Sequence, residues 1–152
     1  MKTTKFNRVL IALDYDENCQ KVAEMGFSMA QIMHAETILL HVINEVPLYY
    51  SSYIFASELK VNIDKDLKKS TQEFLDKAKN HLGDKSIITV LKEGDVADNI
   101  LKTAKQLDID VIIMGSHSRR WLEDIIMGSQ AADVLKNSKI PLLIIPTQKK
   151  AE

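Results

Sequence analysis

The sequence predicts a doubly wound α/β domain, in which a parallel β-sheet carries helices on both faces. Five short runs of β-branched and leucine residues lie along the chain, and segments with the spacing of amphipathic helices separate them. The resulting order, β-α-β-α-β-α-β-α-β, is typical of parallel sheets joined by right-handed crossovers. A length of 152 residues fits one domain, so we expect residues 1–152 to form a single unit.

The apolar runs are the expected strands. Most of them show no alternation with polar residues, which is typical of strands buried on both faces of a parallel sheet. The third run contains Thr89 and follows Lys85 and Ser86, so we expect it at an edge of the sheet. The runs occupy residues 9–13, 38–43, 87–91, 111–114 and 142–145.

The segments between the runs carry apolar residues at helical spacing. Asp16 or Asn18 is expected to cap the first helix and Asp95 the third, because their side chains accept hydrogen bonds from first-turn N–H groups. Gly83 follows the second helix as a C-terminal stop, and Ser129 precedes the fourth as its cap. The apolar stripes run over residues 22–33, 63–82, 97–107 and 131–135.

Composition limits the classes of function. Hydrophobic residues make up 45% of the chain and charged residues 27%, as in ordinary soluble globular proteins. Twenty basic against 21 acidic residues argue against a broad electrostatic contact with nucleic acid or an anionic membrane. No apolar run approaches the roughly 20 residues that span a bilayer. The run at 9–13 is also too short for a signal peptide, so we expect a cytoplasmic protein.

Metal and thiol sites find little support. Cys19 is the single cysteine, which excludes a disulfide framework and a multi-thiolate metal site. Its place in the first turn of a helix would lower the thiol pKa, so we weigh a redox role against an inert packed thiol, which we favour. The histidines lack metal-ligand spacing, and His41, within a strand, is expected to be a satisfied core residue.

Two segments depart from the alternation of strands and helices. The segment at 47–64 contains Tyr49 and Phe55. We interpret it as a loop whose aromatic side chains pack on the sheet, with a flap over a ligand or a partner-binding patch as the alternative. In the segment at 115–128, Trp121 and Ile125 have helical spacing and predict a short docking helix.

The loop after the fourth strand is the candidate ligand site, because open parallel sheets bind ligands beyond the carboxyl ends of their strands. Gly115 ends that strand, and a Gly128-Ser129 pair opens the next helix. These residues predict an anion cradle, in which main-chain N–H groups between residues 115 and 129 hold a phosphate, with Arg119 and Arg120 nearby. The alternative is a plain loop in which Ser129 only caps the helix.

Two other phosphate motifs are absent from the sequence. No Gly-Lys pair occurs, which excludes a P-loop. The first strand ends in Asp14-Tyr15-Asp16 without a G-x-G-x-x-G fingerprint. A nucleotide, if bound, is therefore expected at the fourth loop.

The same loop resembles the signature of the universal stress protein family, G-x-x-G-x9-G-[ST]. Met114 and Gly115 open the motif, residues 119–127 supply the spacer, and Gly128-Ser129 close it. Ser118 stands where the family has its second glycine.

The resemblance implies a fold, a partner and a ligand. The fold is a five-stranded parallel sheet in the order 3-2-1-4-5, Rossmann-like and of the adenine nucleotide alpha hydrolase type. The partner is a second copy, joined through the last strand at Leu142–Ile145. Some members bind ATP with Mg²⁺ or Mn²⁺ held through the phosphates. By resemblance, Ala12 and Asp14 line the nucleoside pocket, the Val42 main chain contacts adenine, and the phosphates fall to Met114, Gly115, Ser118, Gly128 and Ser129.

We therefore predict a stress-response regulatory module that binds ATP or another adenine nucleotide and is not an enzyme. No Ser/His/Asp or Cys/His set follows the strands, so no catalytic residue and no protein metal ligand is predicted. Ser118 motivates an alternative, a nucleotide-free homodimeric interaction protein, because serine is costly where φ must be positive. A slow ATP hydrolase is the second alternative, with Asp14, Asp16 and His117 as candidate bases.

Overall fold

A computed structural model describes residues 1–44, 57–116 and 127–147. Several expected features lie outside these residues: the aromatic segment with Tyr49 and Phe55, the motif position Ser118, and the docking helix around Trp121. Among the described residues, no helix is long and apolar enough to cross a membrane.

The alternation of strands and helices predicted from the sequence is confirmed. The sheet has five parallel strands in the order β3-β2-β1-β4-β5. The strands are β1 (Arg8–Ala12), β2 (Glu36–Ile43), β3 (Ile88–Glu93), β4 (Val111–Gly115) and β5 (Leu142–Ile145). The helices are α1 (Cys19–Ile32), α3 (Ser57–Leu82), α4 (Val96–Gln106) and α5 (Ser129–Asn137).

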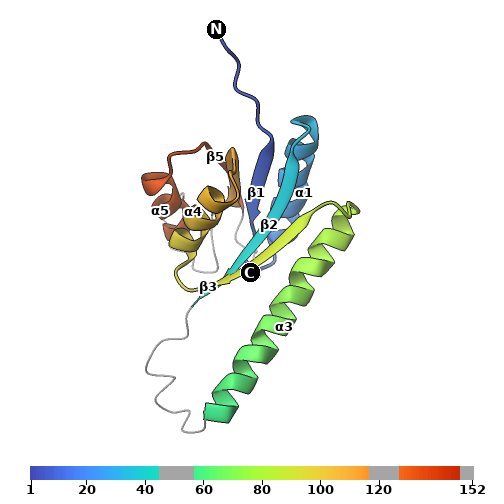
Figure 1. Ribbon diagram of the computed structural model, residues 1–152, viewed down its shortest axis with the longest axis vertical. Coiled ribbons are helices and arrows are strands. Elements are labelled where there is room, and N and C mark those ends of the chain that lie inside the picture. The colour runs from blue at the N-terminus through green and yellow to red at the C-terminus, as the bar shows by residue number, and fades with distance from the viewer. Residues whose placement is uncertain (45–56, 117–126, 148–152) are drawn as a thin grey trace.

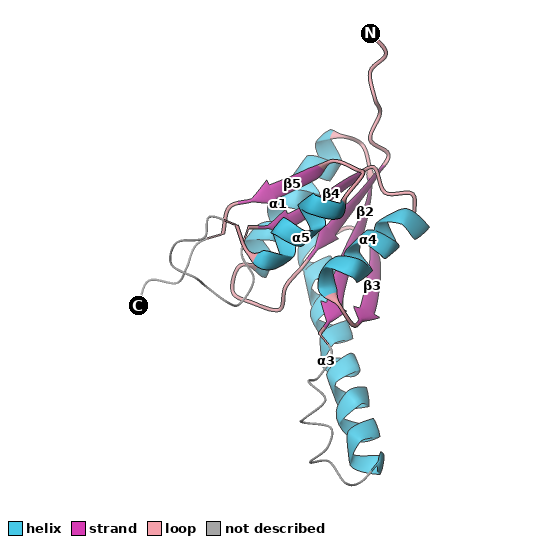
Figure 2. Ribbon diagram, turned by 90° about the vertical axis from the view of Figure 1, so that its left-hand side faces the viewer, coloured by secondary structure: helices cyan, strands magenta, loops and turns pink. Residues whose placement is uncertain are grey.

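Helices cover both faces of the sheet (Figures 1 and 2). Side chains of alternate residues of β1 point to opposite faces, so Ile11 packs beneath α1 and α3, whereas Leu10 packs beneath α4 and α5. Two hydrophobic clusters result, one on each side of the sheet. β3 lies at an edge, as predicted, and its Ile88 is 43% exposed.

Local signals set several helix ends. The Asp95 carboxylate accepts a hydrogen bond from the Asp98 N–H (2.8 Å), which confirms Asp95 as the N-cap of α4. Gly83 ends α3 with a φ of +74°, a conformation that glycine adopts without strain. Asn18 is the N-cap of α1, while Asp16 accepts from the Asn18 N–H. The prediction for α5 is wrong, because Gly128 is its N-cap and Ser129 is already the first helical residue.

Hydrogen bonds and an ion pair of charged side chains stabilise the amino end of the sheet, where the strands begin. The Asp110 carboxylate accepts hydrogen bonds from the Asn7 and Arg8 N–H groups, at 2.7 and 2.9 Å. The Arg8 guanidinium donates to the Leu107 carbonyl oxygen (2.8 Å) and pairs with Glu36 (2.8 Å). Because these bonds join the start of β1 to β2 and to the chain before β4, they fix the register at the centre of the sheet.

Gly26 lets α1 approach β1 closely. A Cβ atom at this position would lie 2.9 Å from Cδ1 of Ile11 and 3.1 Å from its Cγ1. Ile11 is fully buried and branched at Cβ, so its side chain has little freedom to move aside.

We expect Gly26→Ala to lower the free energy of unfolding by about 1 kcal/mol, because the overpacking at Ile11 exceeds the gain in helix propensity. Urea denaturation measures the effect. Ser28→Ala, on the exposed face of the same helix, is the control and should not destabilise the protein. A more stable Gly26→Ala variant would contradict the close approach.

Candidate functional site

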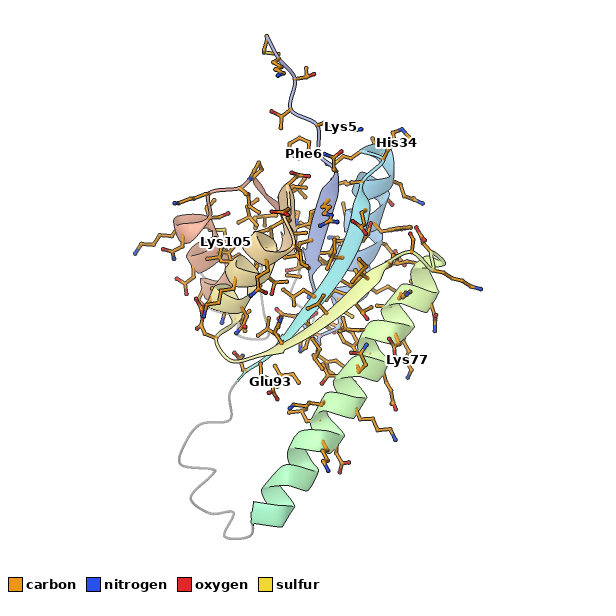
Figure 3. All side chains as sticks on the ribbon, viewed as in Figure 1. Lys5, Phe6, His34, Lys77, Glu93 and Lys105 are labelled. Atoms are coloured by element: carbon orange, nitrogen blue, oxygen red, sulfur yellow. The ribbon has the colours of Figure 1, made fainter. Side chains whose placement is uncertain are left out.

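The candidate site lies at the carboxyl edge of the sheet, where β1 and β4 end side by side. The crossover after β1 passes through α1 on one face, and the chain after β4 continues to α5 on the other. This divergence makes a topological switch point, which is where open α/β sheets bind ligands. Glu93 lies at this edge, and Phe6 and His34 lie at the opposite one (Figure 3).

A small cavity of about 30 Å³ opens at the switch point. Ala12 and Asp14 line it from the end of β1, and Met114 and Gly115 line it from the end of β4. The rest of its wall comes from β2 with Val42, from α1, α4 and the start of α5, and from the chain after β5. The structure thus brings together five of the residues that the sequence assigned to a ligand.

A larger cavity of about 620 Å³ adjoins the first and shares Asp14 and Val42 with it. Its volume lies within the range of small-molecule sites. Ser129 and Gln130 line one side of it, and Leu67, Ser70 and Thr71 of α3 line another. The cavity therefore extends from the start of α5 across the sheet edge to α3, whose N-terminal part reaches past that edge (Figure 1).

The Val42 main chain is directed toward the edge of this space. Successive residues of a central parallel strand direct their N–H and C=O groups to alternate neighbours. The Leu40 carbonyl oxygen accepts from the Leu13 N–H on the β1 side (2.8 Å), and that of Ile43 accepts from the Gly94 N–H on the β3 side (2.9 Å). Val42 therefore faces the β1 side, where its register partner would be residue 14, beyond the end of β1 at Ala12.

Two main-chain N–H groups within the range of the predicted anion cradle are already hydrogen-bonded within the fold. The Ser116 N–H donates to the Ile145 carbonyl oxygen, and the Gly128 N–H donates to the Ser116 carbonyl oxygen. Both groups serve the fold, so they do not point at a phosphate as predicted. The Gly128–Ser116 bond instead closes the loop and sets the start of α5 beside the end of β4.

The first turn of α5 retains the chemistry that an anion needs. The Ala132 N–H is the first to bond back along the helix, to the Gly128 carbonyl oxygen (3.0 Å). The N–H groups of Ser129, Gln130 and Ala131 therefore precede the intrahelical ladder and carry the positive end of the helix dipole. Because Ser129 and Gln130 line the larger cavity, these donors fit a phosphate group at its α5 end.

Ser116 and Thr147 form a buried polar contact that the sequence reading missed. The Thr147 N–H donates to Ser116 Oγ (3.0 Å), and the two hydroxyl oxygens lie 3.2 Å apart. Both residues follow adjacent strands, and Thr147 lines the small cavity. Inspecting the residues after the fifth strand, as was done for the other four, would have found Thr147. Gln130, which lines both cavities, could have been found because it follows Ser129 in the first turn of the helix.

His41 is hydrogen-bonded, as predicted, but it is only half-buried and lines the larger cavity. Its Nδ1 lies 2.6 Å from the Leu13 carbonyl oxygen, and because that oxygen only accepts, Nδ1 carries the proton. The ring of Phe74 on α3 lies edge-on to His41, with centroids 5.8 Å apart, and to Tyr15, at 4.7 Å. This aromatic contact attaches α3 to the ends of β1 and β2.

The acidic residues Asp14 and Asp16 lie beside the small cavity, where a cation bound to phosphates would find oxygen ligands. Among the described residues, no group of three or more His, Cys, Asp or Glu side chains is placed to hold a metal ion.

Comparison with known proteins identifies the family. The model of the universal stress protein family matches residues 5–146. The chain belongs to this family. The universal stress protein YxiE of Bacillus subtilis is 28% identical over 146 residues, which covers 92% of this chain and 99% of YxiE.

Solved structures of universal stress proteins share the fold. The structure of MJ0577, a Methanocaldococcus jannaschii protein, superposes with a TM-score of 0.80 at 24% identity, covering 97% of this chain and all of that one. A universal stress protein in complex with cAMP superposes with a TM-score of 0.67 at 16% identity, covering 95% of this chain and all of that one.

Cys19 of this universal stress protein also lines the small cavity, but its predicted pKa shift has the wrong sign. Burial of the thiol, and then the negative charge of Asp16, raise the pKa of Cys19. These effects exceed the hydrogen bonds from first-turn N–H groups, which lower it. The thiol is therefore protonated at neutral pH, which favours the inert role.

We expect Cys19 to react with iodoacetamide at pH 8 at least about threefold more slowly in the native protein than in the urea-unfolded chain, because the thiolate is the nucleophile. The reaction rate should rise with pH, and its midpoint, the pH at which it is half-maximal, should be higher for the native protein than for the unfolded chain. Asp16→Asn should lower that midpoint. A native midpoint below that of the unfolded chain would show an activated thiol instead.

Proposed function

We propose that this protein binds an adenine nucleotide at the carboxyl edge of its sheet. The observation that carries the proposal is the larger cavity. Its lining runs from Val42, whose N–H and C=O groups face the β1 side, past Asp14 to the first turn of α5. A base, a ribose and a phosphate group need these three surfaces in that order. The cAMP held by a structural neighbour supports an adenine compound as the ligand.

In this arrangement the Val42 N–H and C=O contact the edge of the base, since a donor beside an acceptor matches adenine. Asp14 lies between base and phosphate, where its carboxylate can accept from ribose hydroxyls. The phosphates lie at the N–H groups of Ser129 and Gln130, with Mg²⁺ or Mn²⁺ held mainly by phosphate oxygens near Asp14 and Asp16. ATP is the ligand that the proposal favours.

We propose binding without efficient hydrolysis. A hydrolase must orient a water and accept its proton, which requires a base aimed at the phosphate. Among the described residues, Asp14 and Asp16 are the acids that line the small cavity. In this proposal Asp14 faces the ribose, and the Asp16 carboxylate already accepts from the Asn18 N–H at the start of α1 (2.8 Å).

We also propose that two copies pair through β5. The sheet order places β4 on one side of β5, and within the described residues no strand lies on the other. Three of its apolar residues, Leu142, Leu143 and Ile144, are only partly buried. An apolar edge strand of this kind favours pairing with a second edge. The dimer also provides the surface for the alternative function, a nucleotide-free interaction protein.

We expect Ser129→Glu to weaken Mg-ATP binding at least about fivefold, because a carboxylate at the start of α5 repels the phosphates. The same charge favours the helix N-terminus, so the melting temperature should not fall. Isothermal titration calorimetry measures the affinity. Asn137→Glu places an equal charge at the far end of α5 and should leave binding unchanged. No binding by the wild type at millimolar ATP, or undiminished binding by Ser129→Glu, would exclude this site.

We expect Leu143→Lys to convert the dimer to a monomer, because it places a charge in the paired strands. Light scattering coupled to size exclusion measures the mass. Ile88→Lys makes the same change on the opposite edge strand, β3, and should leave the dimer intact. A wild-type monomer at micromolar concentration would contradict pairing through β5.

A further inference from the structure

The α3 wall of the larger cavity carries two adjacent hydroxyl groups. Ser70 Oγ and Thr71 Oγ1 both donate to the Leu67 carbonyl oxygen, at 3.0 and 2.6 Å. A hydroxyl has one hydrogen and two lone pairs, so a hydroxyl that donates within its own helix can still accept. Both side chains line the cavity, and Thr71 is only 5% exposed. The α3 wall therefore presents hydrogen-bond acceptors to a ligand.

The lining near this wall is neutral or acidic. Asp14 adds a carboxylate, the Asn44 side chain can accept or donate, and no lysine or arginine occurs among the described residues that line this cavity. Because the Ser70 and Thr71 hydroxyls already donate to the Leu67 carbonyl oxygen, a ligand group that donates hydrogen bonds is favoured beside them. A phosphate or a keto oxygen, which only accepts, finds its donors at the α5 end instead.

The position of the wall is fixed relative to the sheet. Phe74, one turn along α3 from Thr71, contacts Tyr15 and His41, and both of these residues line the cavity. Gln72 Nε2 donates to Thr89 Oγ1 of β3 (3.3 Å). Because these contacts, one and three residues after Thr71, hold α3 against the sheet, the Thr71 hydroxyl has a fixed place in the cavity wall, as selective recognition requires.

We infer that Thr71, supported by Ser70, selects a base that carries an exocyclic amino group over one that carries a keto group. The inference rests on the proposed nucleotide site. An amino group has two hydrogens, of which the Val42 carbonyl oxygen accepts one and the Thr71 hydroxyl the other. A keto oxygen at the same place would face oxygen lone pairs on both sides and leave buried acceptors unsatisfied.

The test compares AMP with IMP, which differ in the amino and keto groups of the base. Isothermal titration of the full-length protein should give AMP at least about tenfold tighter binding than IMP. Thr71→Val, which keeps the volume and removes the hydroxyl, should weaken AMP binding about five- to tenfold and leave IMP within about twofold. Thr71→Ser should restore the preference. Thr103→Val alters an equally buried threonine of α4 and should change neither affinity.

Each other result overturns the inference in a distinguishable way. Equal affinities of the wild type for AMP and IMP would remove base selection but keep the nucleotide site. An equal loss of AMP and IMP binding in Thr71→Val, with the melting temperature preserved, would reduce Thr71 to a structural residue. Binding of neither nucleotide at millimolar concentration would overturn the proposed function together with the inference.

Discussion

The central position of β1 is the constraint on which the rest of the structure depends. β1 is paired with β2 on one side and β4 on the other, and residues 9–11 are fully buried. It ends at Ala12, whereas β2 continues to Ile43, past the residue paired with Ala12. The carboxyl edge is therefore stepped, and the step leaves the space beside Val42 that becomes a cavity. A longer β1 would pair with Val42 and close this space.

Most of the fold was predictable because burial on both faces makes parallel strands recognisable as unbroken apolar runs. The cap at Asp95 and the stop at Gly83 were predictable for a similar reason, since each acts through its nearest neighbours in sequence. The prediction of Ser129 as the cap of α5 was wrong because Gly128 adopts the extended conformation that precedes the helix. A serine next to a glycine does not reveal which of the two residues is the N-cap. The predicted direction of the Cys19 pKa shift was wrong because the pKa depends on burial of the thiol, which the sequence of one helix turn does not reveal.

The candidate site likewise contains residues that the sequence could indicate and residues that only the folded structure reveals. Asp14 and Gly115 could be singled out because strand ends of a parallel sheet converge whatever the intervening sequence, whereas Ala12 and Met114 came from the family resemblance. The α3 wall was not found, since Ser70 and Thr71 look like ordinary polar positions of an amphipathic helix. They line the cavity because Phe74 contacts Tyr15 and His41 and so brings α3 to the ends of β1 and β2. Hydrogen bonds that engage the Ser116 and Gly128 N–H groups were equally invisible, because they depend on where β5 and the loop meet.

The fastening of Arg8 and Asp110 has a consequence for how such a protein can change. It lies at the amino edge, the opposite end of the strands from the cavities. Neither Arg8 nor Asp110 lines either of the two cavities, so a substitution at these positions alters how β1 is anchored without altering the walls of the candidate site.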